Sequence, residues 1–250
     1  MLATVLYIVQ IVLGILIIYM IWALFRARRL MNIGQRIAHF TIPFQRLRPG
    51  AKQRILIAGD SSAVGTGATR HEDSTAGRIA ADYPEAEIAN LSRNGMKAAE
   101  LLERLERAHL GTFDMVVLQI GGNDIIRGTK LPELEQVIRK LVPVAKKLSP
   151  RVVIMHSGNL GAAPFFPWLV GKYFTQRTRL VRDMYIKIAK DFGIVYADLF
   201  EEKPTDVFSK ESKRYYAGDL FHPSSEGYGL WYEGIKKALF RLDNDQTQTP

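Results

Sequence analysis

The chain has 250 residues, of which 47% are hydrophobic, enough for one α/β domain of ordinary size with some chain left over. Residues 1–54 hold eight of the 34 basic residues and no acidic one, whereas residues 55–250 hold the remaining 26 basic residues and all 25 acidic ones. Eight of the nine net positive charges therefore belong to the N-terminal segment, and we expect no nucleic-acid partner. The absence of cysteine excludes disulfides, cysteine nucleophiles and thiolate metal sites.

The chain begins with an apolar segment. Leu2 to Phe25 contains no charged side chain, and its 24 residues would span about 36 Å as a helix, enough for a bilayer core of about 30 Å. A cleaved signal peptide is the alternative, but the basic start and the small-residue cleavage site are missing and the run is too long. We therefore predict a transmembrane anchor over 1–28, with the bilayer contacted by residues 2–25.

Basic residues follow the apolar segment and none precede it. Because Lys and Arg near a span are retained on the cytoplasmic side, we expect a single-pass membrane protein whose folded part faces the cytoplasm. Residues 29–52 form a basic juxtamembrane linker or interfacial helix, expected to bind anionic lipid. Its apolar residues recur at helical spacing before Pro43: Leu30, Ile33, Ile37 and Phe40. A solvated basic linker is the alternative.

Strand and helix patterns alternate from residue 53 to 243, which we take as one domain followed by a polar tail, 244–250. Short β-branched or apolar runs occur at 53–59, 86–92, 114–121, 151–158 and 193–200. Helical patterns occur at 75–83, 97–109, 131–148, 175–192 and 224–242. Apolar strands separated by helices predict a parallel sheet covered on both faces.

Small and polar residues gather where predicted strands end, which is where sites form in open parallel sheets. GDSS (59–62), SRNG (92–95) and GGND (121–124) follow the first, second and third strands, and DLFHPS (219–224) precedes the last helix. All four segments are expected to open onto one edge of the sheet.

These four segments resemble the ordered sequence blocks of the SGNH (GDSL-type) hydrolase family, over residues 53 to 240. The resemblance implies a three-layer α/β/α sandwich with a central, mostly parallel five-stranded, flavodoxin-like sheet, here preceded by one transmembrane helix. It also implies a serine ester hydrolase, and with the anchor a membrane-bound one. One departure is visible, because Ser62 stands where the family usually has leucine after the nucleophilic serine.

The residue types fit acyl transfer through a serine. A serine hydroxyl needs a base within hydrogen-bond reach, and imidazole suits this task. We choose Ser61 as nucleophile, His222 as base and Asp219, three residues earlier, as the group that orients the ring. By resemblance, the oxyanion hole consists of the Ser61 and Gly95 backbone N–H groups and the Asn123 side-chain amide, and glycine at 95 suits close approach to a ligand.

Simpler roles explain other candidates. A GDS sequence after a strand can be only a turn, although a turn needs no partner histidine. Asp124 is expected to be an N-cap and not catalytic. His39 and His109 are expected to be structural, and the stronger rivals of His222, His71 and His156, lack an aspartate placed like Asp219.

No cofactor is implied, and no metal-ligand spacing or phosphate-loop ending is present in the sequence. The segment 159–174 is too apolar for an ordinary loop. Its Phe165, Phe166 and Trp168 are predicted to bind substrate or to enter the bilayer, the alternative being a fold back into the core.

We therefore expect hydrolysis of an acyl ester with a lipid-like or medium-length chain, such as a lysophospholipid or an acyl thioester. An O-acyltransferase or a carbohydrate acetylesterase that uses the same residues is the main alternative. A noncatalytic membrane scaffold has no need of serine, histidine, aspartate and asparagine together.

Overall fold

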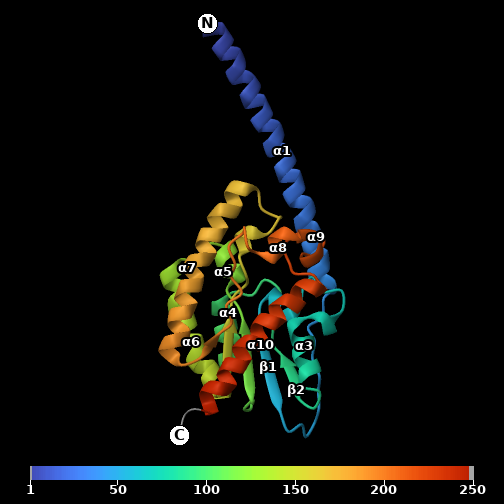
Figure 1. Cartoon of the computed structure of the whole chain (residues 1–250), viewed down its shortest axis with the longest axis vertical. Coiled ribbons are helices and arrows are strands. Elements are labelled where there is room, and N and C mark those ends of the chain that lie inside the picture. Colours follow the sequence, from blue (N-terminus) through green and yellow to red (C-terminus); the bar gives the residue numbers. More distant parts are fainter. Residues whose placement is uncertain (1, 248–250) are drawn as a thin grey trace.

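The computed structural model describes residues 2–247, with side chains described for residues 3–240. Within these residues five strands form one sheet in the order β2-β1-β3-β4-β5, and every neighbouring pair is parallel (Figure 1). The strands are β1 (Arg54–Gly59), β2 (Glu87–Asn90), β3 (Met115–Gln119), β4 (Val152–Met155) and β5 (Val195–Tyr196). Each lies inside a predicted run, so the predicted parallel α/β fold is confirmed.

Helices cover both faces of the sheet. On one side lie α3 (Thr75–Asp82) and α10 (Ser225–Thr247), and on the other α4 (Ala98–Arg107), α6 (Leu131–Leu148) and α7 (Trp168–Phe192). The alternation of side chains along a strand explains the two cores. Ile55 and Ile57 of β1 pack with α3 and α10, whereas Leu56 and Ala58 pack with α4, α6 and α7. The architecture is a three-layer sandwich.

Short helical turns, which the sequence did not predict, occupy the loops. They are α2 (Ser61–Val64), η1 (His71–Asp73), α5 (Gly122–Ile126), η2 (Leu160–Ala162), α8 (Val207–Lys210) and α9 (Ser212–Tyr215). Three to five residues are too few to show a helical period. Two of these turns, α2 and α5, directly follow the carboxyl ends of β1 and β3 and thus carry the polar segments GDSS and GGND.

Two long helices extend beyond their predicted limits. α7 begins at Trp168 rather than near residue 175, because Pro167 provides its N-cap and the apolar residues that follow continue the helix. α10 continues to Thr247, so the first four residues of the predicted polar tail are helical. The rest of that tail, 248–250, lies outside the described residues.

The N-terminal segment is one long helix, α1 (Leu2–Phe40), which projects beyond the domain and then runs down its side (Figure 1). Among the described residues it is the one helix long and apolar enough to cross a membrane, and none of its apolar window is buried. Its second part packs on the domain, where Leu30 is buried and Ile33 and Ile37 are half-buried. The linker is thus a helical continuation as far as Phe40, and its apolar face contacts protein at Leu30, Ile33 and Ile37 but not at Phe40, which is exposed.

The rest of the linker is fixed to the edge of the sheet. Arg46 exchanges two backbone hydrogen bonds with Ile88 of β2, and its guanidinium donates to the carbonyls of Ala80, Tyr83 and Ala86. Arg46 therefore holds the linker against the edge of the sheet. The exposed basic residues of the N-terminal segment are Arg28, Arg29, Arg36 and Lys52.

Gly59 ends β1 where no side chain fits. An added Cβ would lie 1.8 Å from the Gln119 carbonyl oxygen, which accepts a hydrogen bond from the Asp60 N–H. We expect Gly59→Ala to lower the free energy of unfolding by about 3 kcal/mol in chemical denaturation. The matched control is Gly128→Ala, also at positive φ (+71°) but with open space around the Cβ, which should cost only about 1 kcal/mol. Equal losses would contradict this packing.

Candidate active site

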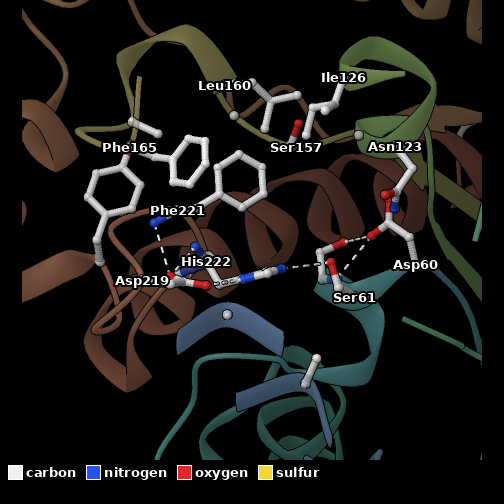
Figure 2. A pocket seen from close by; sticks show the side chains of 18 of the residues that line it. Asp60, Ser61, Asn123, Ile126, Ser157, Leu160, Phe165, Asp219, Phe221 and His222 are labelled. Carbon is white, nitrogen blue, oxygen red and sulfur yellow. Dashed lines mark hydrogen bonds and ion pairs between the residues drawn. The ribbon is translucent and has the colours of Figure 1, made fainter. Parts of the chain in front are cut away.

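The predicted nucleophile stands at a sharp turn after the first strand. Ser61 is the first residue of α2, and its neighbour Asp60 is the N-cap. The Asp60 carboxylate accepts hydrogen bonds from the backbone N–H of Ser62 (3.0 Å) and from the Ser62 hydroxyl (2.8 Å). These bonds hold Ser62 in a buried position and leave the Ser61 side chain directed toward His222 (Figure 2).

His222 joins Ser61 to a buried carboxylate. Its Nε2 lies 3.1 Å from the Ser61 Oγ, and its Nδ1 lies 2.6 Å from the Asp219 Oδ2 (Figure 2). The other Asp219 oxygen accepts hydrogen bonds from the backbone N–H groups of Phe221 and His222, each 3.0 Å long. Burial favours a higher pKa for Asp219, but the hydrogen bonds and the charge of His222 outweigh it and lower the pKa below its ordinary value. The carboxylate is thus ionised near neutral pH.

The loop that carries these residues contains a strained backbone position. Leu220 has φ = +58°, which is uncommon for a residue with a side chain. Its N–H donates to the Ala217 carbonyl, and its own carbonyl accepts from the Phe165 N–H (3.1 Å). This conformation turns the chain between Asp219 and Phe221, so that the Asp219 carboxylate meets both the following N–H groups and the His222 ring.

The residues predicted to form an oxyanion hole line the same cavity as Ser61. Gly95 follows β2 at φ = +75°, a conformation that favours glycine, and Asn123 lies on α5 after β3. Both residues border the cavity that also contains Ser61, His222 and Asp219. Parallel strands thus bring three distant sequence segments to one edge of the sheet.

The cavity measures about 470 Å³ and has mainly apolar walls. One side is formed by Phe165, Phe166 and Phe221, whose rings pack edge to face. Ile126 and Leu160 lie across the opening near Asn123 (Figure 2). Trp168, the third aromatic residue predicted to bind substrate, is 64% exposed and does not border this cavity.

The amino-acid sequence matches the model of the GDSL-like lipase/acylhydrolase family over residues 57–230. The chain belongs to this family. Membership makes it a hydrolase of the esterase and lipase group. The matched region begins within β1 and ends within α10, so that it includes every residue of this site described so far in this subsection.

Solved structures of GDSL-type and other hydrolases have the same fold. A lipolytic G-D-S-L protein from Veillonella parvula is 18% identical with a TM-score of 0.61, covering 75% of this chain and 98% of its own. A phospholipase A1 from Streptomyces albidoflavus is 15% identical (TM-score 0.57; 74% and 99% covered). An acetyl xylan esterase from Geobacillus stearothermophilus is 22% identical (TM-score 0.51; 77% and 95% covered). A search of curated proteins finds no match.

The departure at Ser62 has a local explanation. Where the family usually has leucine, the Ser62 side chain is buried and donates to the Asp60 carboxylate. Burial raises the pKa of Asp60, and the hydrogen bonds from Ser62 oppose that rise. The hydroxyl of Ser62 thus donates to a buried carboxylate beside Ser61, whereas the hydroxyl that contacts the His222 ring is that of Ser61.

Asp124 is structural, as expected, although it caps a different helix from its own. Its carboxylate accepts hydrogen bonds from the backbone N–H of Ala98, at the start of α4 (2.9 Å), and from the Thr129 hydroxyl (3.0 Å). Burial raises its pKa. Asp124 therefore fixes α4 against α5, and α5 carries Asn123.

The other histidines lie away from Ser61. His39 is exposed near the end of α1, His109 is exposed just after α4, and His71 is exposed in η1, beside Glu72. His156 is buried at the end of β4, between the rings of Tyr185 and Tyr196. Among the described side chains, the imidazole that contacts the Ser61 hydroxyl is that of His222.

One wall of the cavity was not predicted from the sequence. Five residues of α1 border it: Leu30, Met31, Gly34, Gln35 and Ala38. The helical spacing of Leu30, Ile33 and Ile37 indicated an apolar face, but their sequence carries no information about whether lipid or protein covers it. The sequence signal that could have indicated close packing against protein was Gly34, a residue without a side chain within that face.

His156 predicts a pH-dependent stability. Burial lowers its pKa from 6.5 to about 4, so between these values the unfolded chain binds a proton that the folded chain does not, and stability falls as the pH decreases. The variant His156→Phe keeps a ring between the tyrosines but has no group that titrates in this range. When the pH is lowered from about 7.5 to about 5, we expect its free energy of unfolding to fall by about 2 kcal/mol less than that of the wild type. Chemical denaturation in detergent measures the difference, and equal losses in both proteins would exclude a neutral buried imidazole.

Proposed function

We propose that the chain is a membrane-anchored serine ester hydrolase that acts through an acyl-serine intermediate. Ser61 is the nucleophile, His222 the general base and Asp219 the residue that orients the ring. The observation that carries this proposal is the continuous contact from Ser61 Oγ to His222 Nε2 and from His222 Nδ1 to Asp219, at 3.1 Å and 2.6 Å. A nucleophile, base and orienting carboxylate in this order are the requirements of serine acyl transfer.

The first half of the reaction forms the acyl-enzyme. The Ser61 Oγ attacks the ester carbonyl carbon while His222 Nε2 takes the hydroxyl proton. The carbonyl oxygen becomes negative, and the N–H groups of Ser61 and Gly95 and the amide of Asn123 donate to it. When the tetrahedral intermediate collapses, the bond to the alcohol oxygen breaks and His222 gives that oxygen its proton. The alcohol leaves and the acyl group remains on Ser61.

The second half repeats these steps with water. His222 takes a proton from the water as its oxygen attacks the acyl carbon, and then returns a proton to Ser61 Oγ as the carboxylic acid leaves. In both halves His222 becomes positively charged. The ionised Asp219 stabilises that charge, and its two hydrogen bonds from backbone N–H groups hold it in place.

The membrane part of the proposal is supported by α1 and by the surface beside it. None of the apolar window of α1 is buried, and the apolar part ends just before Arg26, whose guanidinium donates to the carbonyls of Pro164 and Phe165. The nearby N-terminal end of α7, on the side of the domain from which α1 rises (Figure 1), exposes Trp168, Leu169 and Tyr173. We infer that this end of the domain meets the lipid headgroups.

Charge supports a cytoplasmic domain bound to an anionic leaflet. Arg28 and Arg29 follow the apolar segment and are exposed, as is Arg36 two turns later. Basic residues at this position favour retention on the cytoplasmic side and attract acidic lipid. The substrate we propose is an acyl ester of lipid type, because aromatic rings line the cavity beside Ser61.

Replacement of the nucleophile tests the mechanism. We expect Ser61→Ala to reduce turnover of a chromogenic acyl ester by at least about 1000-fold, because no other hydroxyl contacts the His222 ring among the described side chains. The control is Ser62→Ala, which removes the neighbouring hydroxyl and should keep turnover within about tenfold of wild type. Circular dichroism of both variants checks that the fold persists. Full activity in Ser61→Ala would assign the reaction to another residue.

A further inference from the structure

Helix α1 contacts the active site at three levels. Nearest the apolar segment, Arg26 donates hydrogen bonds to the backbone carbonyls of Pro164 (2.6 Å) and Phe165 (2.9 Å). The Phe165 N–H donates in turn to the carbonyl of Leu220, the strained residue after Asp219. One guanidinium thus ties the start of the packed part of α1 to the loop that holds the catalytic carboxylate.

At the second level α1 passes directly against Asp219. A Cβ added at Gly34 would lie 2.9 Å from the Asp219 Oδ2, the oxygen that binds the His222 ring. Figure 2 shows the blue ribbon of α1 beneath the line of contacts from Asp219 to Ser61. A glycine at this position lets the helix approach the carboxylate without displacing it.

At the third level α1 meets the segment of the oxyanion hole. The Ala38 carbonyl accepts a hydrogen bond from the Asn94 side-chain amide (2.9 Å), and the oxygen of that amide accepts one from the Thr66 hydroxyl. Asn94 immediately precedes Gly95. The position of the Gly95 N–H therefore depends on α1 as well as on the sheet.

We propose that residues 30–38 of α1 form one wall of the substrate pocket, so that the helix that anchors the chain also guides the acyl chain of a membrane-embedded ester to Ser61. The inference rests on the proposed function and names its substrate class. Leu30, Met31 and Ala38 face the cavity from α1, and Phe165, Phe166 and Phe221 border it from other segments. The part of the substrate held between them is an alkyl chain, because these walls present few polar groups.

The distance along α1 fits entry from the bilayer. Arg26 directly follows the apolar segment, and Gly34 lies eight residues further, about 12 Å along the helix axis. Between these two residues the buried Leu30 and the neighbouring Met31 border the cavity that contains Ser61. An acyl chain held against them inside the cavity lies among apolar groups, which avoids the cost of exposing it to water.

A pair of glycine variants in the same helix tests the contact with Asp219. In the full-length chain in lipid vesicles, Gly34→Ala should lower kcat for an octanoyl ester by about 100-fold, because the methyl group displaces the carboxylate that orients His222. Gly14→Ala is the control, since nothing lies within 4 Å of its Cβ, and it should leave kcat unchanged. Equal activity of the two variants would overturn the inference.

A second pair tests the pocket wall independently, and decides the matter if Gly34→Ala does not fold. Ala38→Leu narrows the cavity and should lower the ratio of kcat/KM for dodecanoyl to acetyl esters by about tenfold. Asn32→Leu, an exposed residue of α1 that does not border the cavity, should leave the ratio unchanged. If the enzyme is active and neither Ala38→Leu nor Asn32→Leu changes the ratio of kcat/KM for the two esters, the inference is overturned but the proposed function is not. Absence of ester hydrolysis by the wild-type chain would overturn both.

Discussion

The geometry of the site depends on one buried hydrogen bond, between His222 Nδ1 and Asp219 Oδ2, because it holds the imidazole so that Nε2 faces the Ser61 hydroxyl. The carboxylate is 2% exposed, and a buried charge persists only if it is well compensated. Two backbone N–H groups and the imidazole supply that compensation. The strained conformation of Leu220 brings these groups together, and two backbone hydrogen bonds maintain it: the Leu220 N–H donates to the Ala217 carbonyl, and the Leu220 carbonyl accepts from the Phe165 N–H.

Helix α1 passes against the same carboxylate. The helix that continues from the apolar segment packs on the domain at two points. Gly34 lies against the Asp219 carboxylate, and the Ala38 carbonyl accepts a hydrogen bond from the Asn94 amide. Arg26, which follows the apolar segment, donates to the carbonyls of Pro164 and Phe165, and the Phe165 N–H donates to the loop that holds Asp219. The geometry couples the position of the active site to the end of the apolar segment.

Much of the fold and of the candidate site could be predicted from the sequence. Short apolar strands separated by helices specify a parallel sheet, and a parallel sheet brings the segments after its strands to one edge. For this reason Ser61, Gly95, Asn123 and His222 could be placed together before the structure was known. Asp219 lies three residues before His222, and a tight loop can bring side chains at this spacing together. The contact of Asp219 with the His222 ring could therefore be predicted as well.

The rest depended on contacts between segments far apart in the chain. Hydrophobic spacing in residues 30–37 defines an apolar face but not what covers it, so the packing of α1 on the domain could not be predicted. The apolar segment 159–174 divides into three parts: Leu160 and its neighbours are buried and border the cavity, Phe165 and Phe166 are half-buried and border it too, and Trp168 is exposed and does not. All three parts are apolar, so their composition does not predict which of them is buried, which borders the cavity and which is exposed. Only the contacts with other segments decide this.

The identity of the nucleophile is tested most directly by covalent labelling. The full-length chain is treated with a fluorophosphonate probe and digested with trypsin, and the modified residue is mapped by fragmentation of the peptide 55–70. The account predicts a single label on Ser61, formed because His222 activates that hydroxyl. A label on Ser62 or on a residue outside this peptide, or no label on a folded chain, would contradict it.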